Sequence, residues 1–306
     1  MKILVVGARG LLGKTFENSA RGTVHNWRFK SREDLNLTEA DSLDAELAAF
    51  RPDLVVNCAG FVGGIAKQGS NRFASLSNNL QIEINLQTLL RHRPSIKYLN
   101  FGSSTMYPTS SNPPFAEKEL FTGWPHSANE PYALAKLVGT AMVRYSDEDG
   151  LPHRTLVLSN IYGIEDSFFG DKAHLVPAAI SKTHRAFIDG KSEVKVLGSP
   201  ELMREFTYSK DVTEWVVSNL GDFESWPRVM NLASGENTSV QEVYNIASEM
   251  SGFKGRFLYK FPELSGPNSR LMDSTMARLR FNWRPKIDLR SGMAQIYESL
   301  RGTDLI

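Results

Sequence analysis

Tyr132 and Lys136 have the residue types and the spacing of a pair that moves protons. They lie four residues apart in the segment Tyr-Ala-Leu-Ala-Lys, and on a helix this spacing places both side chains on one face. An ammonium group beside a phenol stabilises the phenolate, so such a tyrosine can act as an acid or a base. Ser103 follows an apolar run, where its hydroxyl can donate a hydrogen bond to a substrate carbonyl. A tyrosine–lysine pair is common on helices, and it becomes informative only together with Ser103 and a nucleotide site.

A glycine-rich turn near the N-terminus is typical of such a nucleotide site. Gly7, Gly10 and Gly13 follow the apolar run Lys2–Val6 and open a helical pattern. Glycine allows a tight turn and a close approach to a pyrophosphate, and the next helix offers N–H groups to the phosphates. The spacing is GxxGxxG, which differs from the usual GxGxxG. The predicted cofactor contacts in this turn are Gly7, Arg9, Gly10, Leu11, Leu12 and Gly13.

The end of the second expected strand favours NADP over NAD. An NAD site usually has an acidic residue there, which binds the ribose hydroxyls. This chain has Lys30-Ser31-Arg32 instead, and Arg9 adds a cation from the glycine turn. Guanidinium groups suit a 2′-phosphate, so Arg32 is a predicted cofactor contact, whereas Asp34 lies too far into the next loop.

The end of the third expected strand is also predicted to touch the cofactor. Asn57 and Ala59 lie there on either side of Cys58. Because a lone cysteine behaves as a small apolar residue more often than as a nucleophile, we expect Cys58 to be buried.

Apolar runs typical of buried parallel strands alternate with helical patterns in the first half of the chain. The expected strands are Lys2–Val6, Leu54–Ala59, Tyr98–Phe101 and Arg154–Ser159. The expected helices are Gly13–Ser19, Thr38–Phe50, Ser77–Leu90 and Pro131–Asp147, with Thr38 as an N-cap and Asp41 at the capping-box position. This alternation predicts an α/β fold with a doubly wound parallel sheet of the Rossmann type.

After about Gly163 the pattern predicts a smaller, mixed α/β lobe that binds substrate. The expected elements are helices Leu175–Arg185 and Ser239–Met250, strands Val194–Leu197 and Val229–Leu232, and a loop over Phe261–Asn268. We expect residues 1–163 with about 206–235 to form the NADP-binding domain, and about 164–205 with 236–306 to form the substrate lobe.

Composition excludes several classes of protein. The 306 residues are 41% hydrophobic and 23% charged with a net charge of +1, which argues against disorder and gives no reason to expect a nucleic-acid or membrane partner. No apolar run approaches the roughly 20 residues that span a bilayer. The single cysteine excludes an internal disulfide, and the six histidines form no HxxH or HxxxH pair, so no metal site is expected. A cytoplasmic protein is the expectation.

Several segments resemble the extended short-chain dehydrogenase/reductases, and among them the GDP-L-fucose synthase branch. They are Arg32–Leu37, Val62–Ile65, Gly102–Pro108, Asn129–Lys136, Ser159–Gly163, His174–Pro177 and Met203–Phe206. The resemblance implies reduction of GDP-4-keto-6-deoxy-mannose by NADPH, with epimerisation at carbons 3 and 5. It also implies a homodimer in which the helices Ser77–Leu90 and Pro131–Asp147 pair across a two-fold axis.

The resemblance assigns roles to the candidate residues. Tyr132 would protonate the oxygen on carbon 4 as NADPH delivers hydride, Lys136 would hold the nicotinamide ribose, and Ser103 would complete the triad. For epimerisation the family uses a cysteine and a histidine as its acid–base pair. His174 matches the histidine, but Thr105 replaces the cysteine.

This departure leaves three alternatives, because a threonine hydroxyl does not ionise near neutral pH. His174 could act with water and epimerise slowly, the enzyme could invert one carbon only, or it could be a 4-ketoreductase without epimerase activity.

The substrate contacts rest on charge and on the resemblance. Arg204, Lys182 and Arg270 are candidate partners for a diphosphate, and Lys182 stands where the family usually has arginine. The resemblance places Asn160 near the sugar, and it lets Asn160 and His174 contact the cofactor as well.

The residue pattern argues against two other functions. An NAD-dependent nucleotide-sugar 4-epimerase or dehydratase would keep a tightly bound NAD, but such enzymes often have an acidic residue where this chain has Arg32. A nucleotide-sensing or redox-sensing regulator commonly lacks the tyrosine or the lysine, and this chain has both.

Overall fold

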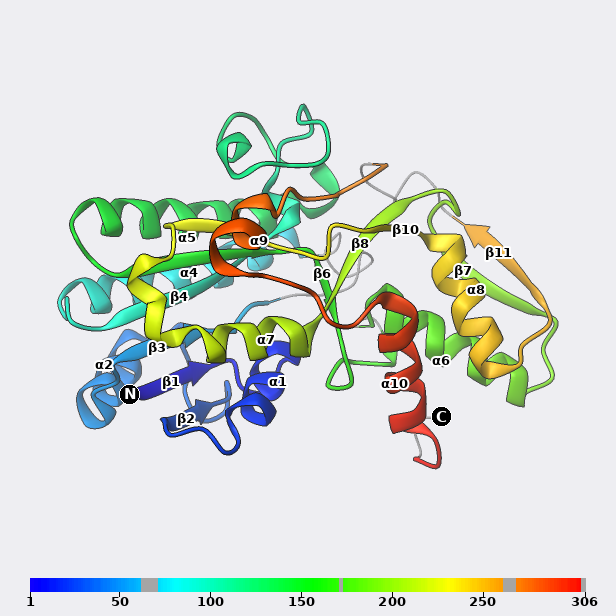
Figure 1. Cartoon of the computed structure of the whole chain (residues 1–306), viewed down its shortest axis with the longest axis horizontal. Helices are drawn as coiled ribbons and strands as arrows, with labels where there is room; N and C mark the ends of the chain where they lie inside the picture. The colour runs from blue at the N-terminus through cyan, green and yellow to red at the C-terminus, as the bar shows by residue number, and fades with distance from the viewer. Residues whose placement is uncertain (62–70, 171–172, 261–267, 304–306) are drawn as a thin grey trace.

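A six-stranded parallel sheet forms the centre of the larger lobe of the computed structural model, which describes residues 1–61, 71–170, 173–260 and 268–303. Its strand order is β2-β1-β3-β4-β5-β9 (Figure 1). The strands are β1 (Lys2–Val6), β2 (Asn26–Lys30), β3 (Leu54–Asn57), β4 (Lys97–Ser103), β5 (His153–Leu158) and β9 (Val229–Leu232). All neighbouring pairs are parallel, so the prediction of a doubly wound parallel sheet is confirmed.

Helices cover both faces of this sheet because side chains of successive strand residues point to opposite faces. One cluster contains Ile3 and Val5 with Phe16 of α1 (Leu11–Ala20) and Val212 of α7 (Ser209–Ser218). The other contains Leu4 and Val6 with residues of three helices. These helices are α2 (Ala40–Phe50), α4 (Arg72–Arg91) and α5 (Glu130–Glu148).

The smaller lobe has a separate apolar core and lies at the right of Figure 1. Strands β10 (Asn237–Ser239), β8 (Met203–Tyr208) and β6 (Asn160–Tyr162) form one sheet, and β11 (Arg256–Lys260) pairs in parallel with β7 (Glu193–Leu197). Its helices are α6 (Leu175–Ile188), α8 (Val240–Ser251) and α10 (Leu289–Leu300). The core cluster includes Ile180, Phe206, Val243 and Ile296, which are all buried.

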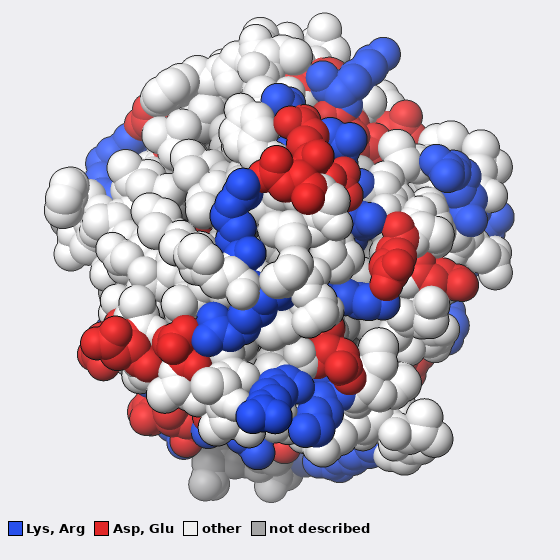
Figure 2. Space-filling view, turned by 90° about the vertical axis from the view of Figure 1, so that its left-hand side faces the viewer, with Lys and Arg blue, Asp and Glu red and all other residues white. Residues whose placement is uncertain are grey.

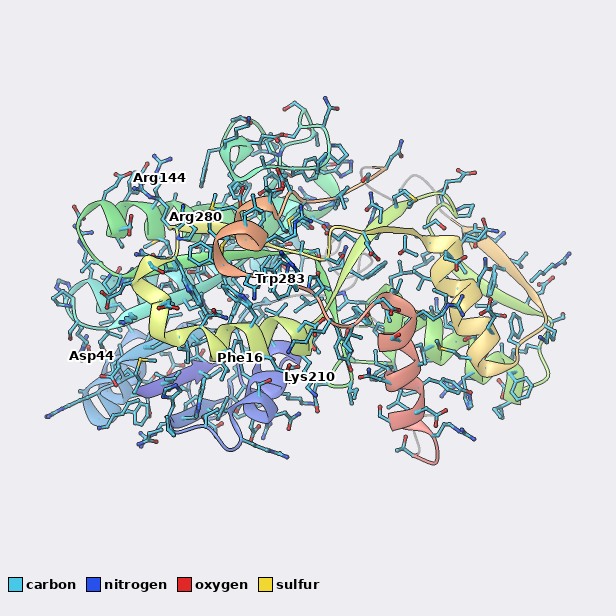
Figure 3. All side chains as sticks on the ribbon, in the orientation of Figure 1. Phe16, Asp44, Arg144, Lys210, Arg280 and Trp283 are labelled. Carbon is cyan, nitrogen blue, oxygen red and sulfur yellow. The ribbon has the colours of Figure 1, made fainter. Side chains whose placement is uncertain are left out.

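One helix from the C-terminal third packs on the large sheet. Helix α9 (Thr275–Phe281) and the segment after it place Ala277 and Trp283 in the same cluster as Phe16. Figure 3 labels Phe16 and Trp283 in this part of the molecule. The division into an NADP-binding domain and a substrate lobe stays a prediction. Helix α9 was expected in the substrate lobe, but it packs on the large sheet.

The N-cap expected at Thr38 is wrong. Helix α2 begins at Ala40 with Glu39 as its N-cap, which makes no side-chain capping bond. The Thr38 N–H and hydroxyl both donate to Asn36 Oδ1, at 3.3 and 2.9 Å. Thr38 therefore lies one residue before the N-cap position, and its side chain is engaged in a local turn with Asn36.

Several other helices and strands begin or end one to several residues from their expected bounds. Helix α4, for example, begins at Arg72 rather than Ser77. Short 3₁₀ turns connect several elements: η1 (Ser104–Met106), η2 (Glu117–Glu119), η3 (Ser127–Asn129) and η5 (Leu220–Ser225). The segment Val62–Ile65 and all but the last residue of the loop Phe261–Asn268 lie outside the described residues.

Surface charge is mixed in sign. Figure 2, which views the left-hand end of Figure 1, shows basic and acidic side chains interspersed. Ion pairs such as Arg93–Asp44 (2.6 Å) illustrate this pattern, as does the net charge of +1. Within the described parts of the chain, no helix is long and apolar enough to cross a membrane.

Candidate active site

The glycine turn between β1 and α1 forms a cradle that a phosphate group fits. Gly7 has a φ of 79°, and a Cβ there would lie 2.5 Å from the Ala59 nitrogen. A Cβ at Gly13 would lie 2.4 Å from the Gly7 carbonyl oxygen. Helix α1 then begins at Leu11 without a side-chain cap, and helix geometry leaves its first N–H groups without partners inside the helix. Glycine at these positions lets the turn pack tightly against its own backbone, and the N–H donors of α1 suit a dinucleotide pyrophosphate.

The end of β2 lies beside this cradle. The Ala8 N–H donates to the Lys30 carbonyl at 3.0 Å, which brings the two loops together. Arg9 pairs with Glu33 at 3.1 Å, and the Arg32 guanidinium lies 4.6 Å from the centre of the Phe61 ring. Both arginines therefore lie beside the glycine turn, and their contact with a 2′-phosphate stays a prediction.

Two other charged side chains at the end of β2, Lys30 and Asp34, bind groups of the protein itself. Lys30 pairs with Glu46 at 3.1 Å. The Asp34 carboxylate accepts the Ser31 N–H (2.9 Å) and hydroxyl (2.7 Å), and these hydrogen bonds lower its pKa. Asp34 thus closes a turn on Ser31 rather than facing the ribose.

Ser103 ends β4, and Thr105 lies in the 3₁₀ turn that follows. The Ser103 hydroxyl oxygen accepts hydrogen bonds from the Thr105 N–H at 3.2 Å and from the Thr105 hydroxyl at 3.0 Å. Because these bonds occupy the lone pairs of the Ser103 oxygen, its proton is left to be donated. A substrate carbonyl oxygen is a suitable acceptor for it.

Tyr132 and Lys136 lie one turn apart on α5, as the spacing predicts. Lys136 is buried and its Nζ lies 3.4 Å from Glu83 Oε1. Burial alone would lower the pKa of the Lys136 ammonium, but the charges of Glu83 and Tyr132 outweigh it, so this pKa lies above its ordinary value. Lys136 is therefore held as a cation.

Glu83 is the residue that the sequence analysis missed. It lies on α4 and is 1% exposed. Besides Lys136, its carboxylate accepts hydrogen bonds from Tyr98 and Gln87, at 3.0 and 3.1 Å, and from Asn57 at 3.3 Å. A signal was present, because the polar residues Asn79, Glu83 and Gln87 recur every four positions on the buried face of α4.

His174 and Asn160 come from the opposite side, where the smaller lobe begins. His174 is the exposed N-cap residue of α6, and Asn160 starts β6. Asn160 Nδ2 donates to the Glu205 carbonyl at 2.9 Å, which leaves its amide oxygen as a possible acceptor. Burial raises the pKa of Asp166, and the His174 charge opposes this rise.

Arg204 and Arg270 lie close enough for the charge of one to affect the other. Burial lowers the pKa of Arg204 to about 10. Burial together with the Arg204 charge lowers the pKa of Arg270 to about 10. Both charges also act on His126, whose pKa is lowered first by burial. Two like charges held in a partly buried place favour an anion.

A cavity of about 200 Å³ lies beside Arg270. Ser104, Thr109, Ser111 and His126 are among the residues that line it. Ser104 directly follows Ser103 in the chain, but Ser103, Tyr132 and Lys136 do not themselves line this cavity.

Lys182 has a different neighbourhood. Its Nζ donates to the Lys195 carbonyl on β7 at 3.2 Å, and burial lowers its pKa. Its role in binding substrate stays a prediction. No group of three or more histidine, cysteine or acidic side chains that could hold a metal occurs among the described residues.

A doubly wound parallel sheet with a glycine cradle, a serine after β4 and a tyrosine–lysine pair on α5 defines a class of enzymes that use a nicotinamide dinucleotide at a carbonyl carbon. Residues 3–233 match the model of the NAD dependent epimerase/dehydratase family, and the chain belongs to this family.

Named relatives extend over nearly the whole chain. GDP-L-colitose synthase from Yersinia pseudotuberculosis is 32% identical over 96% of this chain and 96% of its own length. GDP-L-fucose synthase from Azorhizobium caulinodans is 30% identical over 97% and 95%. A solved structure of a GDP-mannoheptose C4 reductase from Campylobacter jejuni with NADP bound has a TM-score of 0.85, with 26% identity and 97% coverage of both chains. The resemblance drawn from the motifs is confirmed, whereas the roles of individual residues stay predictions.

Proposed function

We propose that this chain catalyses the NADPH-dependent reduction of the 4-keto group of a GDP-bound 4-keto-6-deoxy-sugar. The observation that carries the proposal is that Tyr132 and Lys136 lie one turn apart on α5, and that α5 packs against β4 and the 3₁₀ turn η1, at whose junction Ser103 lies. The charges of Arg204 and Arg270 provide candidate partners for a diphosphate. The names of the relatives support GDP as the nucleotide, and the NADP in the neighbouring solved structure supports the choice of cofactor.

The residues of this chain divide the chemistry among them. When bound, NADPH supplies the hydride to carbon 4. Ser103 donates a hydrogen bond to the carbonyl oxygen, and Tyr132 delivers the proton to that oxygen as its negative charge develops. Lys136 is a cation, so it stabilises the phenolate that Tyr132 leaves behind. The pyrophosphate is held by Gly7, Gly10, Leu11, Leu12 and Gly13. The 2′-phosphate is held by Arg9 and Arg32. The cofactor site is completed by Asn57, Ala59, Asn160 and His174.

One observation favours reduction without epimerisation. The Thr105 hydroxyl is a hydrogen-bond donor to Ser103, so it serves to orient the serine. His174 is then left without the second acid–base group that the family uses, and proton exchange at carbons 3 and 5 is expected to be slow or absent.

The test is a reaction in deuterated water with GDP-4-keto-6-deoxy-mannose and NADPH, followed by NADPH absorbance and by proton NMR of the product. NADPH consumption without deuterium at carbons 3 and 5 supports a plain 4-ketoreductase. Deuterium at both carbons with a fucose pattern supports a full epimerase/reductase. No NADPH consumption, together with NAD that co-purifies with the protein, would overturn the proposal in favour of the 4-epimerase.

We also propose a homodimer in the cytoplasm. Helices α4 and α5 carry exposed apolar side chains, among them Ile84 (43%), Val138 (42%) and Tyr145 (55%), and a second copy of the two helices would cover them. The single free cysteine, Cys58, suits a reducing compartment. Light scattering on Ile84→Asp and Val138→Asp tests the dimer, since a charge in the interface should leave a monomer.

A further inference from the structure

A buried carboxylate lies behind the predicted catalytic lysine, and the proposed mechanism does not use it. Glu83 and Lys136 come from neighbouring helices, α4 and α5, and are 1% and 5% exposed. Their charged atoms are 3.4 Å apart. Burial of an unpaired ammonium group is strongly unfavourable, so the position of Glu83 bears directly on the state of Lys136.

Further contacts hold Glu83 in one place. Tyr98 on β4 and Gln87 one turn further along α4 donate to Oε2, at 3.0 and 3.1 Å, while Asn57 at the end of β3 donates to Oε1 at 3.3 Å. Asn57 also donates to the Tyr98 hydroxyl at 3.0 Å. The carboxylate is therefore aimed at Lys136 by three different elements.

A glycine on α5, Gly139, leaves room for the Glu83 carboxylate. A Cβ at Gly139 would lie 2.7 Å from Glu83 Cδ. Gln87 also donates to the Gly139 carbonyl at 3.0 Å. A glycine here lets the two helices approach closely enough for Glu83 to reach the lysine three residues earlier.

We propose that Glu83 is a positioning residue for the reaction, which fixes the Lys136 ammonium group and keeps it charged, and that Gly139 provides the space for it. This inference rests on the proposed function, because it assumes that Lys136 acts on Tyr132 and on the cofactor. Other groups that face the pair are Tyr132 on α5, Tyr98 on β4 and Cys58 after β3. Burial raises the pKa of the Cys58 thiol, so Cys58 does not compete as a charge.

The first test compares pH profiles of kcat. Glu83→Gln keeps the shape of the side chain and removes its charge, so Lys136 should lose its proton at a lower pH. We expect kcat to fall by roughly ten- to a hundred-fold at neutral pH and to recover as the pH is lowered. Glu83→Asp should retain the wild-type profile with a lower melting temperature. A Glu83→Gln enzyme with an unshifted profile would overturn the proposal.

Two matched variants separate positioning from packing. Gln87→Met removes a hydrogen bond to the same carboxylate but leaves the charge, so it should lower the melting temperature without moving the pH profile. Gly139→Ala keeps both charges and pushes Glu83 away, so it should move the profile in the same direction as Glu83→Gln. If Gln87→Met moved the profile as far as Glu83→Gln, the effect would be one of packing, and the proposal would fail.

A measurement without substrate keeps this inference separate from the proposed function. Melting temperatures of Glu83→Gln, Lys136→Met and the double variant form a cycle. If the charges are coupled, each single variant leaves an unpaired buried charge, and the double variant should melt higher than either. Additive losses would show no coupling and would refute the role of Glu83 whatever the enzyme reduces.

Discussion

Thr105 holds the hydroxyl oxygen of Ser103 through two hydrogen bonds, one from its backbone N–H at 3.2 Å and one from its side chain at 3.0 Å. At the position where the related enzymes are expected to use a thiol for proton transfer, this chain has a group that orients its neighbour. We therefore expect Thr105 to orient the Ser103 hydroxyl and not to take part in proton transfer.

A thiol at position 105 should increase proton exchange at carbons 3 and 5 of the substrate. In Thr105→Cys, we expect deuterium incorporation at carbons 3 and 5 of the substrate to rise above the wild-type level, because a thiol can ionise within the working pH range. Reduction should slow by about ten-fold, since Ser103 loses one hydrogen bond. Proton NMR in deuterated water measures both. Thr105→Ser, which keeps the hydroxyl, is the control, and equal exchange in the two variants would mean that His174 is not placed for this chemistry.

Removal of the Tyr132 hydroxyl should stop reduction without loss of the cofactor. Tyr132→Phe keeps the ring and eliminates the only proposed proton donor to the oxygen on carbon 4, so kcat should fall by about 10²- to 10⁴-fold. NADPH oxidation gives the rate, and quenching of protein fluorescence gives NADPH affinity, which should change little. Tyr145→Phe, at an exposed position on the same helix, serves as the control. A fully active Tyr132→Phe enzyme would remove the catalytic assignment.

The Arg270 charge should lower the stability of the free enzyme and increase its affinity for the nucleotide sugar. It is 5% exposed and lies near the Arg204 charge, so Arg270→Met relieves a repulsion between buried groups and should raise the melting temperature. The same change removes a charge-assisted contact to a diphosphate, so KM for the nucleotide sugar should rise by about 10- to 100-fold. Arg280→Met, at an exposed site on α9 (Figure 3), should do neither. An unchanged KM would separate Arg270 from the substrate site.

His153 should make the fold sensitive to acid. It is fully buried at the start of β5, and burial, together with the Arg154 charge, lowers its pKa from 6.5 to about 4. The unfolded chain therefore takes up a proton at a higher pH than the folded chain does. The stabilising contribution is complete above pH 6.5 and is lost as the pH falls towards 4, by about 3 kcal/mol.

Urea unfolding between pH 7 and 4 measures this effect. His153→Phe keeps the ring that packs edge-on against Tyr98 and should flatten the pH dependence of the unfolding free energy. His92→Gln, at the exposed end of α4, should leave the dependence unchanged. If His153→Phe followed the wild-type curve, the acid loss would come from other groups.

Much of the large sheet was predictable because parallel strands buried on both faces are nearly continuous apolar runs. Lys2–Val6 and Val229–Leu232 have the predicted bounds. In the smaller lobe, β7 was predicted as Val194–Leu197, but the strands of the β10-β8-β6 sheet were not. Strand β8 pairs with β6, some 45 residues earlier at Asn160↔Phe206, and with β10 at Glu205↔Asn237. Such short strands depend on partners that are distant in the chain, and local pattern does not identify those partners.

By itself, the sequence determined the local chemistry of this protein: the glycines that open a phosphate cradle, the one-turn spacing of Tyr132 and Lys136, and the replacement of a cysteine by Thr105. These features depend on residue type and on spacing within one element. Only the tertiary structure decided what each group faces. It turned Thr105 onto Ser103, brought Arg270 within range of the Arg204 charge, and placed Glu83 behind Lys136. Thr105 and Ser103 are near neighbours in the chain. Glu83 and Arg270 each interact with a residue more than 50 positions away, so these interactions form only when distant segments pack together.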